Sequence, residues 1–301
     1  MTALHLESRR AESAARSARA AAVSRQPNDS GTAGGQTASD GRHYPLARNA
    51  AEHARLALQA EFWAADAAAL FASADLPRGG RVADLGCGTL HIAEQLGRAV
   101  GEHGTVLALD SDALLLASLR AHALAPVAVE HGDAYALAWP DACLDAAHAR
   151  FLACPAGRVD TLVAEMRRVV RPGGTLLLQE PVGDSWDVPA GDAWPRTLAL
   201  IRAGFRARGG DFDLGARLVD RLAAAGLRDV RTRTITHTFA ASHPYARLPL
   251  AFCDSLAPLW RERAMVDDGE LAGLRSAIER GLAAPRAKVT TFTLVQAWGR
   301  R

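Results

Sequence analysis

Several features that define other protein classes are missing from this sequence. The net charge is only +2 and Lys288 is the one lysine, so the chain as a whole lacks the basic surface that nucleic-acid binding requires. The 4 cysteines form no Cys-x-x-Cys pair, and no histidine stands at zinc-finger spacing from a cysteine pair. We therefore expect buried free thiols, no metal site and no nucleic-acid partner.

Long apolar stretches are missing as well. No run approaches the ~18 residues that cross a bilayer, and the first residues contain no apolar signal-peptide core. We expect a cytoplasmic protein without membrane association. The apolar fraction of 49% is nevertheless ample for a hydrophobic core, which excludes a disordered chain.

The beginning of the chain differs in composition from the rest. Residues 26–42 are rich in Gly, Ser, Asn, Asp and Thr, which is typical of a flexible linker. We expect residues 1–42 to form a flexible tail and residues 43–301 to form the main domain. An arm that covers the active site or a neighbouring subunit is the alternative, and a homodimer stays open.

Strand-like and helix-like segments alternate in the central part of the chain. Short segments rich in Leu and Val stand at 81–85, 105–109, 127–130, 144–149 and 175–178, with helical patterns between them at 90–100, 112–124 and 159–170. This alternation indicates βαβ units around a buried sheet. The predicted fold is α/β, Rossmann-like and doubly wound, with a mostly parallel sheet.

Further helical and extended segments are expected before and after this alternating part of the chain. A helix is expected over 50–74, before the first strand. After residue 180 the rhythm changes, and helical inserts are expected at about 184–227 and 243–284, with a strand-like run at 230–237. An extended run at 288–298 follows the second insert. We expect these inserts to form a pocket for a second substrate.

The segment Asp84-Leu85-Gly86-Cys87-Gly88 stands at a strand-to-helix junction, where ligands bind in open α/β sheets. Gly86 and Gly88 allow the backbone to turn tightly and to approach a ligand closely. The pattern is not the dinucleotide fingerprint G-x-G-x-x-G, because His91 occupies the third glycine position.

Carboxylates mark the ends of three successive predicted strands. Asp84 belongs to the first, Asp110 closes the second, and Asp133 follows the third. An acid at Asp110 can accept hydrogen bonds from two ribose hydroxyls, and Asp133 can accept one from an exocyclic amino group such as that of adenine. A ligand with a cationic centre, an ammonium group and a ribose suits this set better than a pyrophosphate does.

With these motifs, the chain resembles the class I S-adenosylmethionine-dependent methyltransferases, in a bacterial small-molecule subgroup. The matching core motifs are Asp84-Leu85-Gly86-Cys87-Gly88, Ala108-Leu109-Asp110, Gly132-Asp133-Ala134, His148-Ala149-Arg150-Phe151-Leu152 and Arg171-Pro172-Gly173-Gly174. The segments similar to the subgroup are Tyr44-Pro45-Leu46 with Glu52, Arg55 and Gln59, then Gln179-Glu180-Pro181, and Gln296-Ala297-Trp298-Gly299-Arg300. The resemblance runs from about Tyr44 to Arg301.

The resemblance implies S-adenosylmethionine as the cofactor and methyl transfer to O, N or C of a small-molecule metabolite, in secondary metabolism. It assigns the methionine end to the Asp84–Gly88 segment, the ribose to Asp110, and the adenine to Asp133 and the Ala134 amide. The full set of implied cofactor-binding residues is Tyr44, Asp84, Gly86, Cys87, Gly88, Asp110, Ser111, Asp133, Ala134, Ala149 and Arg150. One departure is Leu90, where many members have a third glycine, and it would narrow the space beside the methionine end.

Three residues are candidates for catalysis. Glu180 ends the fifth predicted strand, so it can serve as a base or bind an amine, or it can be tied to backbone N–H groups. Arg150 can pair with a substrate carboxylate or form a surface ion pair. Tyr44 can close over the cofactor as a lid or pack the linker onto the core. His148 is interpreted as a structural histidine.

Two other functions stay open. One is an enzyme that consumes S-adenosylmethionine without methyl transfer, for example by cyclising it, and Leu90 is the reason to consider it. Its product would be methylthioadenosine rather than S-adenosylhomocysteine. The other is a non-catalytic cofactor-binding protein, which a sealed or collapsed acceptor pocket would favour.

Overall fold

The computed structural model describes residues 50–120 and 123–301. The chain divides into two units, Met1–Ala38 and Ser39–Arg301, and every residue described below belongs to the second. The predicted flexible tail, residues 1–42, and the proposed lid residue Tyr44 lie outside the described residues.

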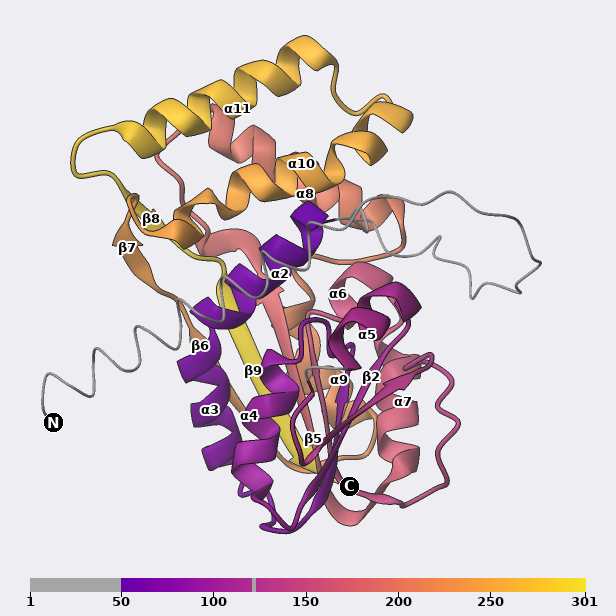
Figure 1. The fold of residues 1–301 in the computed structure, drawn as a ribbon. Coiled ribbons are helices and arrows are strands. Elements are labelled where there is room, and N and C mark those ends of the chain that lie inside the picture. The colour runs from indigo at the N-terminus through magenta and orange to yellow at the C-terminus, as the bar shows by residue number, and fades with distance from the viewer. Residues whose placement is uncertain (1–49, 121–122) are drawn as a thin grey trace, which may run out of the picture. The chain divides into compact units, whose positions relative to one another are not determined.

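A seven-stranded sheet runs through this unit in the order β3-β2-β1-β4-β5-β9-β6 (Figure 1). The first five strands in chain order pair in parallel, whereas β9 runs antiparallel to both β5 and β6. The strands are β1 (Arg81–Leu85), β2 (Thr105–Asp110), β3 (Val127–His131), β4 (Leu144–Arg150), β5 (Val170–Val182), β6 (Arg228–Ile235) and β9 (Thr293–Arg300). The mostly parallel, Rossmann-like α/β fold predicted from the alternating pattern is confirmed.

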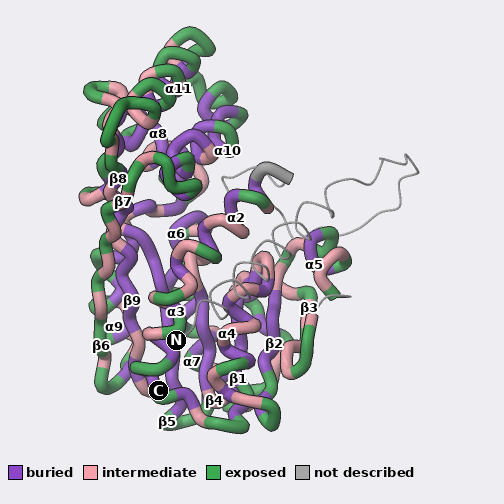
Figure 2. The backbone as a smooth tube through the Cα atoms, turned by 60° about the vertical axis from the view of Figure 1, so that its left-hand side comes forward, coloured by how far each residue is buried: buried purple, intermediate pink, exposed green. Residues whose placement is uncertain are grey.

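Alternate side chains of the central strands enter two hydrophobic cores, one on each face of the sheet. Val82 belongs to the core that contains α3 (Ala64–Ser73) and α4 (His91–Val100). Ala83 belongs to the core that contains α7 (Val159–Val169). Figure 2 shows the inner strands buried, while the edge strands β3 and β6 carry exposed residues. Burial on both faces explains why the inner strands read as continuous apolar runs.

The predicted inserts are helical and gather at one end of the sheet (Figure 1). Helices α8 (Ala193–Ala207), α10 (Leu248–Glu262) and α11 (Asp268–Ala283) pack against one another. Helix α9 (Leu218–Ala224) instead packs on β6 and β9 and so belongs to the layer that covers the sheet. Strands β7 (Thr238–Ala240) and β8 (Lys288–Thr290), of which β7 was not predicted, pair as a small second sheet.

Two of the predicted elements are each divided in two, and in each case a bulky side chain at the break is buried in the core. The helix expected over 50–74 is two helices, α2 (Ala50–Phe62) and α3, on either side of Trp63. Trp63 is fully buried, and its indole N–H donates to the Tyr245 hydroxyl at 2.8 Å. The extended run expected over 288–298 is likewise divided between β8 and β9 at buried Phe292.

Other boundaries shift for local reasons. Helix α5 (Ala113–Leu119) is shorter than the expected 112–124, and it begins after Asp112, whose carboxylate accepts from two backbone N–H groups of its first turn. Strand β5 includes residues 171–174, which were expected as a turn before the strand.

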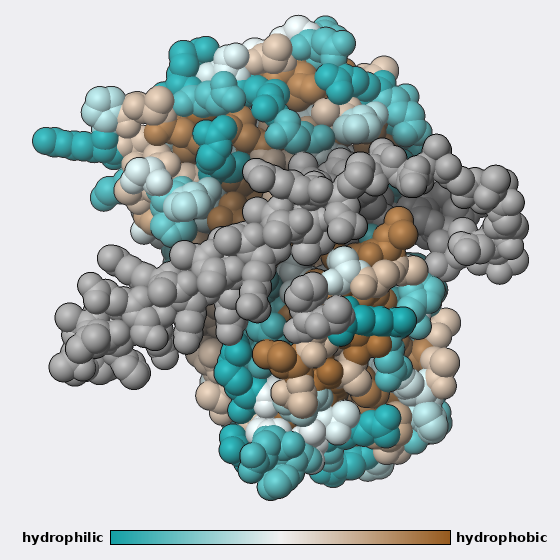
Figure 3. Space-filling view, viewed as in Figure 1, coloured by the Kyte–Doolittle hydropathy of each residue, from teal (hydrophilic) through white to brown (hydrophobic). Residues whose placement is uncertain are grey.

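In the view of Figure 3, hydrophilic residues cover most of the visible coloured surface. None of the described helices has the length and apolar character that crossing a membrane would require.

Candidate functional site

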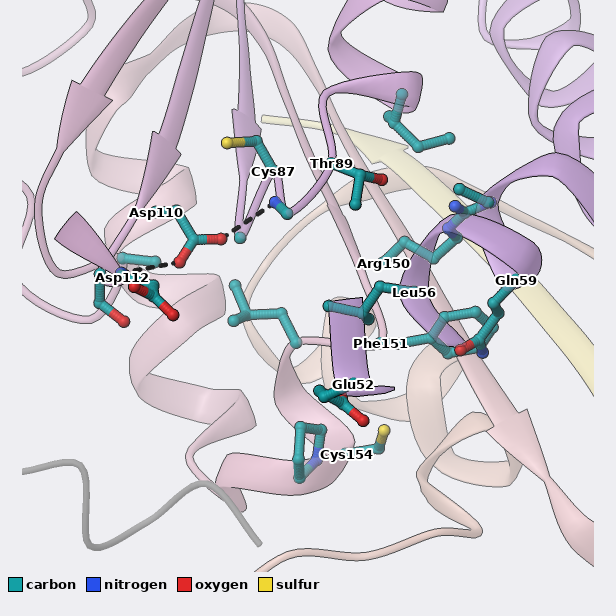
Figure 4. Close-up of a pocket in the computed structure, with 18 of the residues that line it drawn as sticks. Glu52, Leu56, Gln59, Cys87, Thr89, Asp110, Asp112, Arg150, Phe151 and Cys154 are labelled. Atoms are coloured by element: carbon teal, nitrogen blue, oxygen red, sulfur yellow. Dashed lines mark hydrogen bonds between the residues drawn. The ribbon is translucent and has the colours of Figure 1, made fainter. Parts of the chain in front are cut away.

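A pocket lies where the parallel strands β1, β2 and β4 end, and helix α2 contributes to its wall (Figure 4). Of the predicted cofactor-binding residues, the pocket is lined by Asp84, Gly86, Cys87, Gly88, Asp110, Ser111, Asp133, Ala134 and Arg150. Ala149 is fully buried within β4 and does not line it. Figure 4 shows Asp110 and Asp112 on one side of the pocket and Gln59, Arg150 and Phe151 on the opposite side.

The turn after β1 is tight and leaves open space beside it. The backbone N–H groups of Gly86 and Cys87 both donate to the Leu109 carbonyl, at 2.8 and 3.0 Å. Gly86 has φ +69°, and a Cβ there would meet a methyl of Leu152 at 2.9 Å. Gly88 has φ +50° and no atom within 4 Å of where its Cβ would stand. Glycine at both positions is therefore a backbone requirement, and the space next to Gly88 is available to a ligand.

Leu90, the departure that was expected to narrow this space, points elsewhere. Its φ of +65° places it in the left-handed region at the start of α4. Its side chain is buried in the core between the sheet and α4, and it does not line the pocket. The expectation that Leu90 constrains the methionine end was therefore wrong.

The carboxylate of Asp110 is held in one orientation. One oxygen accepts from the Gly88 backbone N–H at 3.0 Å, and the other accepts from the Asp112 backbone N–H at 3.0 Å (Figure 4). Asp133 accepts from the Tyr135 backbone N–H at 2.9 Å. Backbone N–H groups thus pin both acids at the rim of the pocket.

Two opposite charges in the pocket have an atom without a partner among the described residues. Asp84 uses Oδ1 to contact His148, while its buried Oδ2 has no hydrogen bond. One terminal nitrogen of Arg150 is also buried and unpaired. Burial lowers the pKa of Arg150 to about 10, and the negative charge of Asp84 opposes that shift. Unpaired buried charges are costly, so this arrangement favours a ligand that carries both a cation and an anion.

Comparison with known proteins identifies the part of the chain that builds this pocket. Residues 82–174 match the family model described as a methyltransferase domain. This part of the chain is a methyltransferase domain. The predicted family is thereby confirmed for the segment that contains the glycine turn, Asp110, Asp133 and Arg150.

Individual relatives agree with this assignment over part of their length. An uncharacterized 37.1 kDa protein from a Streptomyces fradiae transposon is 40% identical over 105 residues, which cover 34% of this chain and 30% of that protein. The 2-phytyl-1,4-naphtoquinone methyltransferase of Synechococcus elongatus is 34% identical over 134 residues, which cover 38% of this chain and 58% of the enzyme. The chain thus spans less than two thirds of the length of these curated relatives.

Solved structures agree on the fold over a longer stretch. A Bacillus halodurans protein described as a methyltransferase superposes with a TM-score of 0.54 at 19% identity, covering 78% of this chain and 98% of that protein. At this identity the similarity supports the fold and not the acceptor.

Helix α2 is fastened over the methyltransferase domain by a buried ionic network. Arg55 donates two hydrogen bonds to Glu52, at 2.6 and 2.8 Å, and one to Gln59 at 2.6 Å. Ser255 of α10 donates to Glu52 at 3.0 Å, and the Arg55 guanidinium lies 4.9 Å from the centre of the Phe252 ring. The segment predicted as a lid helix is therefore tied to an insert helix by side chains that line the pocket.

The remaining wall of the pocket is aromatic. The phenylalanines that line it are Phe151, Phe205, Phe212, Phe252 and Phe292. These five residues come from different segments of the chain and carry no common motif. Several of these rings contact one another at centroid distances of 5.2–6.3 Å. They form an apolar surface within the pocket, and the Arg150 guanidinium lies beside it, 5.6 Å from the centre of the Phe151 ring.

Glu180 does not face the pocket, which corrects its expected role as a catalytic base. The residue is fully buried, and its carboxylate accepts from the backbone N–H groups of Ala153 and Cys154, at 2.9 and 3.3 Å. These residues begin the short helix α6 (Ala153–Ala156), which was not predicted. Burial raises the pKa of Glu180 to about 7, against the opposing effect of these hydrogen bonds. Glu180 is therefore tied to the backbone of the loop after β4 and does not line the pocket.

Neither thiol near the pocket is set up as a nucleophile. Burial and the negative charges of Asp84 and Asp110 raise the pKa of Cys87. Burial and the negative charge of Glu180 raise the pKa of Cys154 well above its ordinary value. Among the described residues, no group of three or more His, Cys, Asp and Glu side chains is arranged to hold a metal ion.

Proposed function

We propose that the protein binds S-adenosylmethionine at the charged end of the pocket and transfers its methyl group to a small molecule seated on the aromatic wall. The observation that carries this proposal is that two opposite charges beside the glycine turn of a methyltransferase domain each keep one buried atom without a partner, Oδ2 of Asp84 and one terminal nitrogen of Arg150. Both line the same pocket as Asp110 and Asp133.

The residues present fit each part of this cofactor. Its amino-acid end carries an ammonium and a carboxylate, which match the free oxygen of Asp84 and the free nitrogen of Arg150. We assign Arg150 to this carboxylate rather than to an acceptor, because its charge acts on His91 at the start of α4 and it is stabilised by Asp84. Asp110 would hold the ribose, and Asp133 with Ala134 would hold the adenine.

The cofactor supplies a methyl group that is already activated, so the chain mainly has to align the acceptor and exclude water. The aromatic wall suits an acceptor with a flat, apolar ring. The Glu52–Arg55–Gln59 network holds α2 against α10 and keeps its own charges internally paired, so it forms part of the pocket wall without placing an unpaired charge beside the acceptor. The naphthoquinone named for the Synechococcus relative is a ring of this kind.

Two structural findings weigh against the alternative functions. Leu90, which favoured a non-methylating reaction, lies outside the pocket. The aromatic wall lines an open pocket. A collapsed pocket would have favoured a non-catalytic protein.

Calorimetry with S-adenosylmethionine and a turnover screen test the proposal together. Flat phenols and quinols should be methylated in preference to aliphatic amines, with S-adenosylhomocysteine as the coproduct. Arg150→Leu should weaken cofactor binding by roughly 10- to 100-fold, since a hydrogen bond to a charged group contributes about 1.5–3 kcal/mol. Arg280→Leu, at an exposed position on α11, is the matched control and should bind normally. Methylthioadenosine as the main product, or no binding by the unmodified protein, would reject methyl transfer.

A further inference from the structure

A row of buried polar side chains crosses four neighbouring strands beneath α3. Asp84, His148, Gln179 and Gln296 come from β1, β4, β5 and β9, and each is at most 2% exposed. The strands are adjacent in the sheet, with Asp84 opposite His148 and Gln179 opposite Gln296. Polar residues at such positions in an otherwise apolar sheet require partners, and these four find most of theirs in one another, while Asp84 Oδ2 and Gln296 Oε1 have no partner among the described residues.

The hydrogen bonds of this row are continuous. His148 Nδ1 lies 2.9 Å from Asp84 Oδ1, and Gln179 Nε2 lies 2.8 Å from His148 Nε2. Gln296 Nε2 donates to Gln179 Oε1 at 2.8 Å and to the backbone carbonyl of Asp66 in α3 at 3.1 Å. The row therefore runs from the pocket acid Asp84 to the first turn of α3.

The chemistry of the two ends fixes the direction of every bond between them. The Asp66 carbonyl can only accept, so Gln296 must present its amide N–H₂ group there and also donate to Gln179 Oε1. Gln179 then has only its N–H₂ group left for His148, so His148 Nε2 must accept. His148 consequently carries its proton on Nδ1 and donates it to Asp84.

An imidazolium at this position would be opposed by the same arrangement. Its Nε2–H would point at the N–H₂ group of Gln179, and two donors would face each other in a buried site. The other groups that face the ring are Asp84 from β1 and, edge to face at 5.3 Å, Phe71 from α3. Because Gln179 presents its N–H₂ group to the ring, the described contacts offer no acceptor for a proton on His148 Nε2.

We propose that Gln179 and Gln296 hold His148 as the neutral Nδ1–H tautomer, so that His148 does not neutralise the negative charge that Asp84 presents to the cationic cofactor. His148, Gln179 and Gln296 are then positioning residues for cofactor binding, acting through Asp84. The part of this inference that concerns the cofactor rests on the proposed function, and the part that concerns the tautomer does not.

The tautomer can be measured without any ligand. The protein has 10 histidines, and ¹⁵N labelling of their rings, with His148→Gln to assign the signal, reports which nitrogen carries a proton. We expect His148 to show a protonated Nδ1 and an unprotonated Nε2. A ring protonated on Nε2 overturns the proposal.

A pair of variants at Gln179 tests the link to cofactor binding. Gln179→Glu supplies an acceptor for Nε2, so His148 should become an imidazolium paired with Asp84, and S-adenosylmethionine should bind roughly tenfold more weakly. Gln179→Leu, of similar size, removes the donor without supplying an acceptor, so Nε2 should stay unprotonated and the loss of affinity should be smaller than in Gln179→Glu. Melting curves show whether each variant folds. The ¹⁵N measurement on the unmodified protein tests the proposed tautomer of His148 even if a variant does not fold.

The outcomes separate the two proposals. A protonated Nε2 in Gln179→Glu with unchanged affinity would refute the role of the Asp84 charge. Equal losses of affinity in both variants would assign Gln179 a purely structural role. If the unmodified protein binds no S-adenosylmethionine, the proposed function fails while the tautomer measurement still decides the direction of the row.

Discussion

Replacing Glu180 with glutamine should change how the stability of the protein depends on pH. The carboxyl group is fully buried, and its pKa is raised from an ordinary value of 4.5 to about 7 because burial disfavours the charged form. Folding therefore favours the protonated acid. A difference of this size corresponds to roughly 3 kcal/mol of unfolding free energy.

The sign follows from proton binding. Between pH 4.5 and about 7 the folded protein binds more protons at this site than the unfolded chain does, so the contribution of Glu180 to stability falls as the pH rises. It is fully present below pH 4.5 and fully lost above about pH 7. The glutamine of the Glu180→Gln variant would not ionise, and its amide oxygen can still accept from the Ala153 N–H. The substitution therefore changes the unfolding free energy by a constant amount, and position 180 of the variant adds no dependence on pH.

Urea unfolding of both proteins at several values between pH 4.5 and 8 measures this effect. The unfolding free energy of the unmodified protein minus that of Glu180→Gln should decrease by roughly 3 kcal/mol across this range. Glu279→Gln, at an exposed position on α11, is the control and should give the same difference at every pH. A Glu180→Gln difference that does not change with pH would refute the burial argument.

The same variant separates positioning from catalysis. Loss of a general base lowers turnover by about 10²- to 10⁴-fold. Because Glu180 binds the backbone of α6 and does not line the pocket, we expect kcat to fall less than about tenfold. A thousandfold fall in kcat in a folded variant would show that Glu180 acts as a catalytic base.

The remaining predictions concern the turn, its acid and the start of the chain. Asp110→Ala removes the acceptor for the Gly88 N–H and the proposed ribose contact, so calorimetry should show S-adenosylmethionine binding weakened by roughly 10- to 100-fold, and unchanged affinity would reject the assignment. Gly86→Ala should lower the unfolding free energy by about 1–3 kcal/mol, because φ is +69° and the new Cβ would meet Leu152, and a neutral result in urea would contradict that geometry. Deleting residues 1–42 should leave the melting temperature nearly unchanged because few apolar side chains are lost, whereas a large drop would show that they dock on the domain or on a partner subunit.

The sheet and the charged end of the pocket could be predicted because each depends on local chemistry. Alternating apolar runs place the parallel strands, and an acid at the end of a strand stays at the end of that strand in the fold. Asp84, Asp110 and Asp133 were therefore found from spacing alone. Arg150 was found as well, but its burial and its unpaired nitrogen depend on what packs around it.

The features that sequence analysis missed depend on contacts between distant segments. The aromatic wall combines Phe151 and Phe292, which are far apart in the chain and have ring centres 5.8 Å apart. The break at Trp63 requires Tyr245, and no pattern within residues 50–74 could indicate that partner. The sequence left Glu180 open between a base and a carboxylate tied to backbone N–H groups, because its partners in α6 belong to a helix of four residues with no recognisable pattern.

The antiparallel strand β9 has a consequence for the order in which this protein can be assembled. It lies between β5 and β6 but follows both in the chain, so during synthesis β6 emerges with no neighbour in the sheet. Gln296, which determines the direction of the buried polar row, belongs to the same late strand. A ribosome-bound chain can thus complete the glycine turn and the three pocket acids well before it completes the support of Asp84. Domains whose last strand enters the middle of a sheet must finish folding after that strand leaves the ribosome, and here the same step completes the buried polar row behind Asp84.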